Sequence, residues 1–317
     1  MTPAKSAYKG LVEAGYSPDA VSVFFAPRAA VHVVHPFNEM LGQNVAPEYL
    51  ATLSQAFTGL QRADYMVFGD GDWVTATGYW RGVFDKPFLG IEPTSALAHL
   101  RVGEFHRVEN GQAVESYIYL DLPELMIASG QWPDDVPSPA SAIGYTGYLP
   151  GPDTQDGLQW GDGDTTLTAS SLKMVTDMLL SLATKDEAWR PYWHDDMVWY
   201  GPAAFGSFYG IEGFASFQVP FEGCFSHWMG GATPGSGTKH FARFADGNYI
   251  ASGGWPSLNA HQTKPFLGQP ATHKDLMMRV CDWWRRDGDK LKENWVFVDI
   301  PDVLRQMGRD LFEGVRA

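Results

Sequence analysis

One stretch of the chain places a histidine and two carboxylates where they could move a proton. Glu104 and His106 lie two residues apart in HLRVGEFHRV, a predicted strand, so both side chains should point to one face. Asp121 follows the next predicted strand, VESYIYL. Histidine titrates closest to physiological pH, and a carboxyl in an apolar wall has a raised pKa. The three residues are therefore candidates for general acid–base catalysis.

Aromatic side chains near these groups could form the wall of a pocket for a flat apolar ligand. Tyr117 and Tyr119 precede Asp121 at the same spacing of two, which predicts a common face that also includes the carboxylate. Trp80 lies within the predicted strand DWVTATGYWRGVF. Core packing is the commoner role of large rings, so ligand binding by Trp80, Tyr117 and Tyr119 is a hypothesis that stands beside that alternative.

The same motif occurs a second time. Residues 86–126 align with residues 264–304 without a gap and are identical at 12 of 41 positions, which indicates a tandem duplication. In the second copy the candidate catalytic residues are Asp282 and Asp299, and the candidate ligand-binding residues are Trp255, Trp284 and Trp295. Trp284 stands where the first copy has His106. We therefore expect the copies to differ, with the histidine-bearing copy carrying the activity.

Structural roles compete with catalytic ones for most of these acids. Asp121-Leu-Pro-Glu and Asp299-Ile-Pro-Asp both read as a helix start, with an acid at the N-cap and proline just inside, so capping is the alternative role of both aspartates. Glu115 and Glu293 are expected to pair with arginines. A carboxyl without a neutralising partner inside a pocket would favour an enzyme, whereas complete pairing would favour a binding or structural role.

Composition restricts the class of protein. A net charge of −14 over 317 residues argues against nucleic acid and anionic membranes as partners. The two cysteines and nine histidines show no ligand spacing, so a metal site is not expected. The first residues do not resemble a signal peptide, and no stretch approaches 18 apolar residues. These observations predict a cytoplasmic protein.

The elements around the motif predict an α+β fold, with helices first and a meander of antiparallel strands after them. In the first copy, Ser17-Pro18 starts a helix, residues 47–59 form another, and Asn110-Gly111 turns the last hairpin. In the second copy, helices are predicted over 170–183 and 185–193, ahead of a strand over 197–202.

Two domains follow from the duplication, over residues 1–132 and 166–317. Residues 133–165 between them are rich in Pro, Gly and Asp without periodicity, which is typical of a linker. Tyr145, Tyr148 and Trp160 in this segment need apolar cover, so we expect an ordered but irregular strap.

Several stretches resemble the SnoaL-like polyketide cyclases, or predicted ester cyclases, of the NTF2-like superfamily. They are MVWYGPAAFGSFYGIEGFASFQ and RVCDWWRRDGDKLKENWVFVDIPDVLRQMG in the second copy and RVGEFHRVENGQAVESYIYLDLPELM in the first. The resemblance implies two tandem NTF2-like (cystatin-like) cones, each a curved antiparallel sheet covered by helices, packed as an internal pseudo-dimer. Association of two chains into a further homo-dimer is left as an alternative. It also implies a cofactor-free pocket with a catalytic His–Asp pair, whose residues would be His106 and Asp121.

Two functions are compatible with these observations. The first is a cofactor-independent, polyketide-cyclase-like enzyme that performs aldol-type cyclisation or isomerisation on a hydrophobic, carbonyl-bearing small molecule. The alternative is a non-catalytic protein that binds an apolar small molecule in aromatic-lined pockets. The sequence shows no phosphate-binding loop, nucleophile elbow or dinucleotide fingerprint, which argues against nucleotide chemistry and serine hydrolysis.

Overall fold

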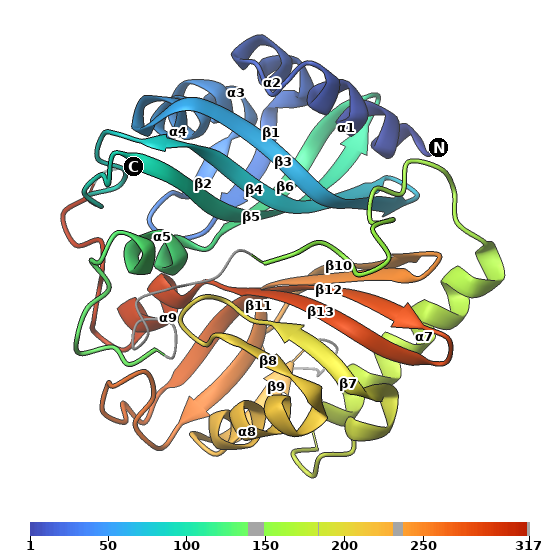
Figure 1. Cartoon of the computed structure of the whole chain (residues 1–317), viewed down its shortest axis with the longest axis vertical. Coiled ribbons are helices and arrows are strands. Elements are labelled where there is room, and N and C mark those ends of the chain that lie inside the picture. The colour runs from blue at the N-terminus through green and yellow to red at the C-terminus, as the bar shows by residue number, and fades with distance from the viewer. Residues whose placement is uncertain (139–148, 183, 231–236, 316–317) are drawn as a thin grey trace. The chain divides into compact units, whose positions relative to one another are not determined.

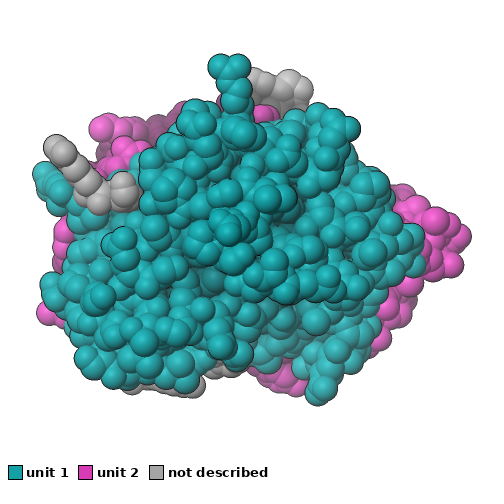
Figure 2. All heavy atoms as spheres, turned by 90° about the horizontal axis from the view of Figure 1, so that it is seen from above, with its two compact units in different colours: residues 1–132, 144–162, 311–317 teal, residues 133–143, 163–310 magenta. Residues whose placement is uncertain are grey.

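The computed structural model describes residues 1–138, 149–182, 184–230 and 237–315, and the chain divides into two compact units (Figure 2). Unit 1 comprises residues 1–132, 144–162 and 311–317, and unit 2 comprises residues 133–143 and 163–310. Each unit is an α+β structure built on one sheet, as the sequence predicted.

Unit 1 is built on a six-stranded sheet with the strand order β2-β1-β6-β5-β4-β3 (Figure 1). Its strands are β1 (Phe25–Val33), β2 (Asn38–Leu41), β3 (Phe57–Asp70), β4 (Trp73–Phe84), β5 (Ala96–Glu109) and β6 (Gln112–Leu120). Neighbouring strands are antiparallel except β1 and β6, which run parallel. The four long strands β3 to β6 form the meander that the sequence predicted.

Short helices pack on this sheet. They are α1 (Pro3–Glu13), α2 (Pro18–Phe24), α3 (Gly42–Asn44), the π-helical turn η1 (Val45–Leu50), α4 (Ala51–Ala56) and α5 (Leu122–Ala128). Thr2 and Ser17 cap α1 and α2 by accepting hydrogen bonds from backbone N–H groups of the first turn, ahead of a proline at the first helical position. Because α1 lies against β3, β4 and β5, its residues Tyr8 and Leu11 are buried.

Unit 2 repeats this arrangement around a sheet with the path β10-β11-β12-β13-β7-β8, to which β9 adds by pairing with β11. Its elements are α7 (Thr165–Leu182), η2 (Arg190–Tyr192), β7 (Trp193–Tyr200), β8 (Ser207–Tyr209), α8 (Gly210–Glu222), β9 (Phe225–Gly230), β10 (His240–Asp246), β11 (Tyr249–Gln262), β12 (Asp275–Asp287), β13 (Lys290–Val298) and α9 (Ile300–Gln306). No helix within the described ranges is long and apolar enough to cross a membrane.

The predicted helix over 185–193 is wrong. The described residues there form turns and only the short 3-10 helix η2. Lys185 and Glu187 have φ angles of 57° and 61°, which lie in the left-handed region and cannot continue an α-helix. The chain therefore reaches β7 through a tight loop.

The segment expected to be a strap is described only in part, because Tyr145 and Tyr148 lie outside the described residues. Residues 149–162 contain no helix and no strand beyond an isolated bridge between Val67 and Leu158. The N–H of Val67 donates to the carbonyl of Gly157 at 2.8 Å, and the N–H of Gln159 donates to the carbonyl of Val67 at 2.7 Å. This part of the segment is thus fixed to β3.

The central hairpins of the two units share one irregularity. The turn at Asn110-Gly111 forms as predicted, but Val114 of β6 bulges out, so that Arg107 pairs with Glu115. Lys292 of β13 bulges in the same way. A one-residue bulge exchanges the faces of all side chains beyond it. The faces predicted for β6 and β13 relative to β5 and β12 are therefore inverted.

Candidate active site

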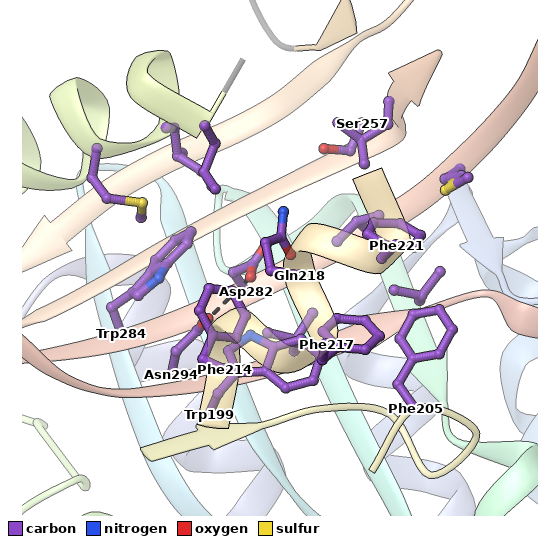
Figure 3. Close-up of a pocket in the computed structure, with 18 of the residues that line it drawn as sticks. Trp199, Phe205, Phe214, Phe217, Gln218, Phe221, Ser257, Asp282, Trp284 and Asn294 are labelled. Carbon is purple, nitrogen blue, oxygen red and sulfur yellow. Dashed lines mark hydrogen bonds between the residues drawn. The ribbon is translucent and has the colours of Figure 1, made fainter. Parts of the chain in front are cut away.

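Unit 2 contains a cavity of about 490 Å³ bounded by its sheet, α7 and α8 (Figure 3). Its wall is mostly apolar, and its aromatic members are Trp193, Trp199, Phe205, Phe214, Phe217, Phe221 and Trp284. Residues three and four positions apart share a helix face, so α8 presents three phenylalanines to the cavity. The rings also pack on one another, with Phe217 stacked on Trp199 at a centroid distance of 4.9 Å. This volume and wall suit an apolar small molecule.

The polar side of this cavity comes from β12 and β13. Asp282 and Trp284 lie two residues apart on β12, and Asn294 and Val296 lie two apart on β13. The antiparallel register pairs Asp282 with Val296 and Trp284 with Asn294. Directly opposed residues of an antiparallel pair share a face, so all four side chains line the cavity. Figure 3 shows Asp282 and Asn294 side by side, joined by a hydrogen bond.

Asp282 supplies a carboxyl group to the lining of the cavity. Asn294 Nδ2 donates a hydrogen bond to Asp282 Oδ1 at 3.4 Å, and Asp282 forms no ion pair with any residue in the described part of the chain. Burial raises the pKa of Asp282 to about 7, against smaller lowering effects of the Asn294 hydrogen bond and the charge of Arg243. A carboxyl that titrates near neutrality can both accept and return a proton, as general acid–base catalysis requires.

A hydrogen-bonded network on β10 and β11 supplies further polar groups. Arg243 Nε donates to Ser252 Oγ at 3.2 Å, and an Arg243 terminal nitrogen lies 3.3 Å from His240 Nδ1. His240 Nε2 lies 3.0 Å from Ser257 Oγ. Burial first, and then the charge of Arg243, lower the pKa of His240 to about 4, so the ring is neutral at pH 7. The network therefore offers the cavity one cation that does not pair directly with Asp282.

Trp284 offers a hydrogen-bond donor to whatever occupies the cavity. Its side chain is 1% exposed, and its indole Nε1 has no acceptor among the described residues. Leaving a buried donor unsatisfied is unfavourable by about 1–3 kcal/mol. A ligand carbonyl placed beside Asp282 could accept from this N–H, because both groups belong to the same face of β12.

The equivalent place in unit 1 is closed. Glu104 corresponds to Asp282, but only about 10 Å³ of cavity remains beside it. Arg62 of β3 lies 2.9 Å from Glu104 Oε1 and 2.6 Å from Asp64 Oδ1. Burial raises the pKa of Glu104, but the charge of Arg62 and hydrogen bonds from His106 and Arg62 outweigh it and lower the pKa to about 2. Glu104 is thus a neutralised carboxylate.

His106 and Glu104 lie together, as the sequence predicted, but in a filled core. His106 Nε2 lies 3.3 Å from Glu104 Oε2, and its Nδ1 lies 2.9 Å from Ser116 Oγ. Tyr8 of α1 stacks on the imidazole at 5.6 Å, and His106 is 1% exposed. Trp80 borders the same small cavity. The larger cavity lies in the copy that lacks the histidine, and which copy carries the activity stays a prediction.

Asp121 and Asp299 are helix caps. Asp121 accepts from the N–H of Glu124 at 3.3 Å, and Asp299 accepts from the N–H of Asp302 at 3.2 Å. Asp299 Oδ2 also lies 2.9 Å from Arg279 Nη1. Neither aspartate lines the cavity of its own unit. The structure shows the capping role, and a catalytic role of either aspartate stays a prediction.

The hairpin bulges explain why three predicted ligand-binding aromatics lie on the other face of their sheets. Tyr117 and Tyr119 alternate with Ile118, which borders the unit 1 cavity, and Trp295 alternates with Val296 in unit 2. Tyr117 stacks on His32 at 4.5 Å. A regular hairpin without the bulge would have turned all three toward the cavities. They line neither cavity, and their role in ligand binding stays a prediction.

Trp255 also lies outside the lining of the large cavity. An irregularity between Gly254 and Leu258 carries it out of register, and Leu258 takes the cavity position opposite Met278. Trp255 instead lies under the guanidinium of Arg279, 4.4 Å from its ring centroid. Of the predicted ligand-binding residues, Trp284 lines the large cavity and Trp80 the small one.

Sequence reasoning missed several residues of the cavity. The spacing of Phe214, Phe217 and Phe221 along α8 was a readable signal of one aromatic helix face. Asn294 could not be assigned to the cavity from the sequence, because the bulge at Lys292 decides which face of β13 it occupies. Arg243 and His240 lie on a strand whose sequence, HFARFAD, carries no pattern that distinguishes a cavity lining from an ordinary polar face.

Each unit is a curved and mostly antiparallel sheet with helices on it. Residues 5–128 match the SnoaL-like polyketide cyclase family. This match covers the first repeat, and the second repeat has the same order of central strands and the same hairpin bulge. No curated protein is similar enough to the chain to be matched.

Solved structures similar to the chain include three from different bacteria. A candidate SnoaL-like polyketide cyclase of Jannaschia sp. CCS1 is 21% identical, with a TM-score of 0.37, over 41% of this chain and 94% of its own. IdmH, a candidate polyketide cyclase of Streptomyces antibioticus, is 20% identical, with a TM-score of 0.35, over 40% and 97%. An LEH-like epoxide hydrolase of M. tuberculosis is 16% identical, with a TM-score of 0.34, over 45% and 93%.

Proposed function

We propose that unit 2 is a cofactor-independent acid–base enzyme that acts on a hydrophobic small molecule with a carbonyl group. The observation that carries this proposal is Asp282, a carboxyl with a pKa raised to about 7 by burial, which lies in an aromatic cavity without an ion-pair partner in the described chain. Structural carboxylates are normally paired when buried, whereas catalytic ones have perturbed pKa values.

The proposed step is proton transfer at carbon. The Asp282 carboxylate removes a proton from the carbon next to the ligand carbonyl, and the negative charge moves to the carbonyl oxygen. The Trp284 N–H and the nearby Arg243 guanidinium stabilise that oxygen, because donors aimed at developing charge are most effective in a dry site. Protonated Asp282 then returns the proton to another carbon, which is isomerisation, or to the oxygen formed when the enolate attacks a second carbonyl, which is aldol cyclisation.

The cavity wall defines the substrate class. Phenylalanine and tryptophan rings surround Asp282, and Arg243 and His240 offer polar contacts on β10. A flat, largely apolar ring system with one or two carbonyl groups matches this distribution of groups. Unit 1, with Glu104 neutralised by Arg62, has no comparable site in its described residues and would serve a structural role.

A simple proton-transfer probe tests this proposal. The compound 5-nitrobenzisoxazole opens to a coloured phenolate when a base removes a single proton from its ring carbon. We expect the whole chain to accelerate this opening, with a rate that rises with pH through about 7 as Asp282 loses its proton. Asp282→Asn should lower the rate about 10²–10⁴-fold. Asp196→Asn, a change at an exposed acid of β7, is the matched control and should have no effect.

The carbonyl requirement is tested with 2-tetralone, whose protons next to the carbonyl exchange with D₂O. Wild-type protein should accelerate this exchange, and Asp282→Asn should not. An Asp282→Asn variant with wild-type rates for both probes would contradict the catalytic role of Asp282. If 2-tetralone bound saturably and quenched tryptophan fluorescence, but the protein accelerated neither reaction, the binding-protein alternative would replace the enzyme.

A further inference from the structure

Three side chains with metal-binding atoms meet on neighbouring strands of unit 2. His227 belongs to β9, His261 to β11 and Asp275 to β12. The register pairs His261 directly with Asp275, and β9 runs antiparallel to β11 with His227 beside His261. Neighbouring strands lie about 4.8 Å apart, so the three side chains form one row across the sheet. Sequence spacing could not show this row, because its members come from three separate strands.

The distances within the row are close to those of a metal site. His261 Nδ1 lies 2.7 Å from Asp275 Oδ1, and His227 Nε2 lies 3.7 Å from the same oxygen. One ligand atom from each residue lies within 4.8 Å of the other two. A tetrahedral ion with bonds of about 2.0–2.1 Å holds its ligand atoms about 3.3 Å apart. Small side-chain rotations are therefore enough to reach binding distance.

We propose that His227, His261 and Asp275 bind one divalent transition-metal ion of the Zn²⁺, Ni²⁺ or Cu²⁺ type. Two imidazoles and one carboxylate suit these ions, whereas Ca²⁺ and Mg²⁺ prefer oxygen ligands alone. The side chains are 43%, 32% and 49% exposed, so an ion can reach them from solvent and water can complete its coordination. This proposal differs from the expectation from sequence spacing that the chain has no metal site.

A surface ion pair between His261 and Asp275 would account for only two of the three residues. It leaves the position of His227 unexplained. The imidazole of His227 stacks on that of His261 with centroids 5.3 Å apart and planes inclined by 23°, and its Nε2 faces the same carboxylate. Two protonated imidazoles would repel each other in this arrangement, whereas two neutral imidazoles can share one cation.

The ion would cross-link three strands of the sheet, β9, β11 and β12. β9 pairs with β11 alone among the described strands, so it is held by one neighbour only. A metal bridge from His227 to His261 and Asp275 would tie β9 to two strands at once. None of the three residues lines the cavity, so the site is separate from the proposed acid–base chemistry.

Metal titration of the full chain tests the proposal. The protein is prepared with a histidine-free tag, stripped with EDTA, and titrated calorimetrically with ZnCl₂, NiCl₂ and CuCl₂ at pH 7.5. We expect one ion per chain for at least one metal, and a loss of affinity of at least about tenfold in His261→Ala and in His227→Ala. His194→Ala is the matched control, because His194 contacts Asp287 at the opposite end of β12.

Electron paramagnetic resonance of the Cu²⁺-loaded wild-type chain gives a readout that does not depend on the variants folding. Its hyperfine pattern should show two imidazole nitrogens, and one in His261→Ala. Absence of saturable one-to-one binding for all three metals would overturn the proposal. Undiminished binding in the His227→Ala/His261→Ala double variant would also overturn it, because the ion would then lie elsewhere.

Discussion

Asp282 of β12 and Glu104 of β5 occupy the same position in the two repeats but have opposite electrostatic environments. Glu104 faces the Arg62 guanidinium at 2.9 Å, whereas Asp282 accepts a hydrogen bond from Asn294 at 3.4 Å and has no ion-pair partner among the described residues. Burial raises the pKa of Asp282 to about 7, while in Glu104 the charge of Arg62 overcomes burial and lowers the pKa to about 2. The same position therefore holds a carboxyl that titrates near neutrality in unit 2 and an ion-paired carboxylate in unit 1. The two carboxyls should affect the free energy of unfolding in opposite ways.

Replacing Asp282 by asparagine should stabilise the protein at alkaline pH. The unfolded carboxyl has a pKa of about 3.9, so the raised value of about 7 in the folded state means that folding becomes less favourable as pH rises between these two values. Asp282→Asn removes this penalty, and we expect a gain of roughly 1–3 kcal/mol at pH 8 and none near pH 4. Urea denaturation at both pH values measures it. An equal effect at the two pH values would contradict the assignment.

Glu104→Gln should have the opposite effect. The pKa of Glu104 is depressed, so its stabilising contribution is present above the unfolded value of about 4.3 and is lost as pH falls toward about 2. Removing one partner of a buried pair costs about 3–5 kcal/mol, and the lower end is expected because Arg62 keeps Asp64. At pH 7, urea unfolding should show that Glu104→Gln is much less stable than wild type. At pH 3, the difference in stability should be smaller. A gain in stability at pH 7 would contradict this account.

Trp284→Phe separates hydrogen bonding from packing in the cavity. Phenylalanine keeps an aromatic ring but lacks the N–H, which has no acceptor in the described part of the chain. We expect little loss of stability from the missing donor, but weaker binding of 2-tetralone by roughly one order of magnitude, as for a hydrogen bond worth about 0.5–1.5 kcal/mol. Tetralin, the hydrocarbon analogue without the carbonyl, should bind both proteins equally well. Equal weakening for both ligands would show that only ring packing had changed.

The sequence could predict the fold because the repeat and the strand alternation are local signals. It could also place Glu104 with His106 and Asp282 with Trp284, since each pair lies on one strand. The faces of β6 and β13 were not predictable in this way, because the bulges at Val114 and Lys292 invert them. One extra residue in a strand has no clear composition signal, yet it decides which side chains reach the cavity.

The state of the two pockets depends on contacts between residues distant in sequence. Arg62 contacts Glu104, and Tyr8 contacts Arg62 and stacks on His106, although Arg62 and Tyr8 lie 42 and 96 residues away from Glu104 in sequence. In unit 2 the edge of the sheet is divided between β9 and β10, where unit 1 has the continuous strand β3 that carries Arg62. The histidine of the motif therefore lies in the copy whose pocket is closed.

Asp299 provides a last test, which distinguishes a helix cap from a catalytic group. Its side chain accepts from the N–H of Asp302 and lies 2.9 Å from the Arg279 guanidinium, outside the cavity. Asp299→Asn can still cap α9, whereas Asp299→Ala cannot. Losing a cap costs about 0.5–2 kcal/mol, so the alanine variant should be less stable than the asparagine variant by about that amount in urea unfolding.

Both Asp299 variants should open 5-nitrobenzisoxazole at the wild-type rate at 25 °C, because neither change touches Asp282 or the aromatic wall. Equal stability of the two variants would contradict the cap. A rate reduced about 10²-fold or more in the folded Asp299→Asn variant would show that Asp299 takes part in catalysis, since a general acid or base contributes about that much.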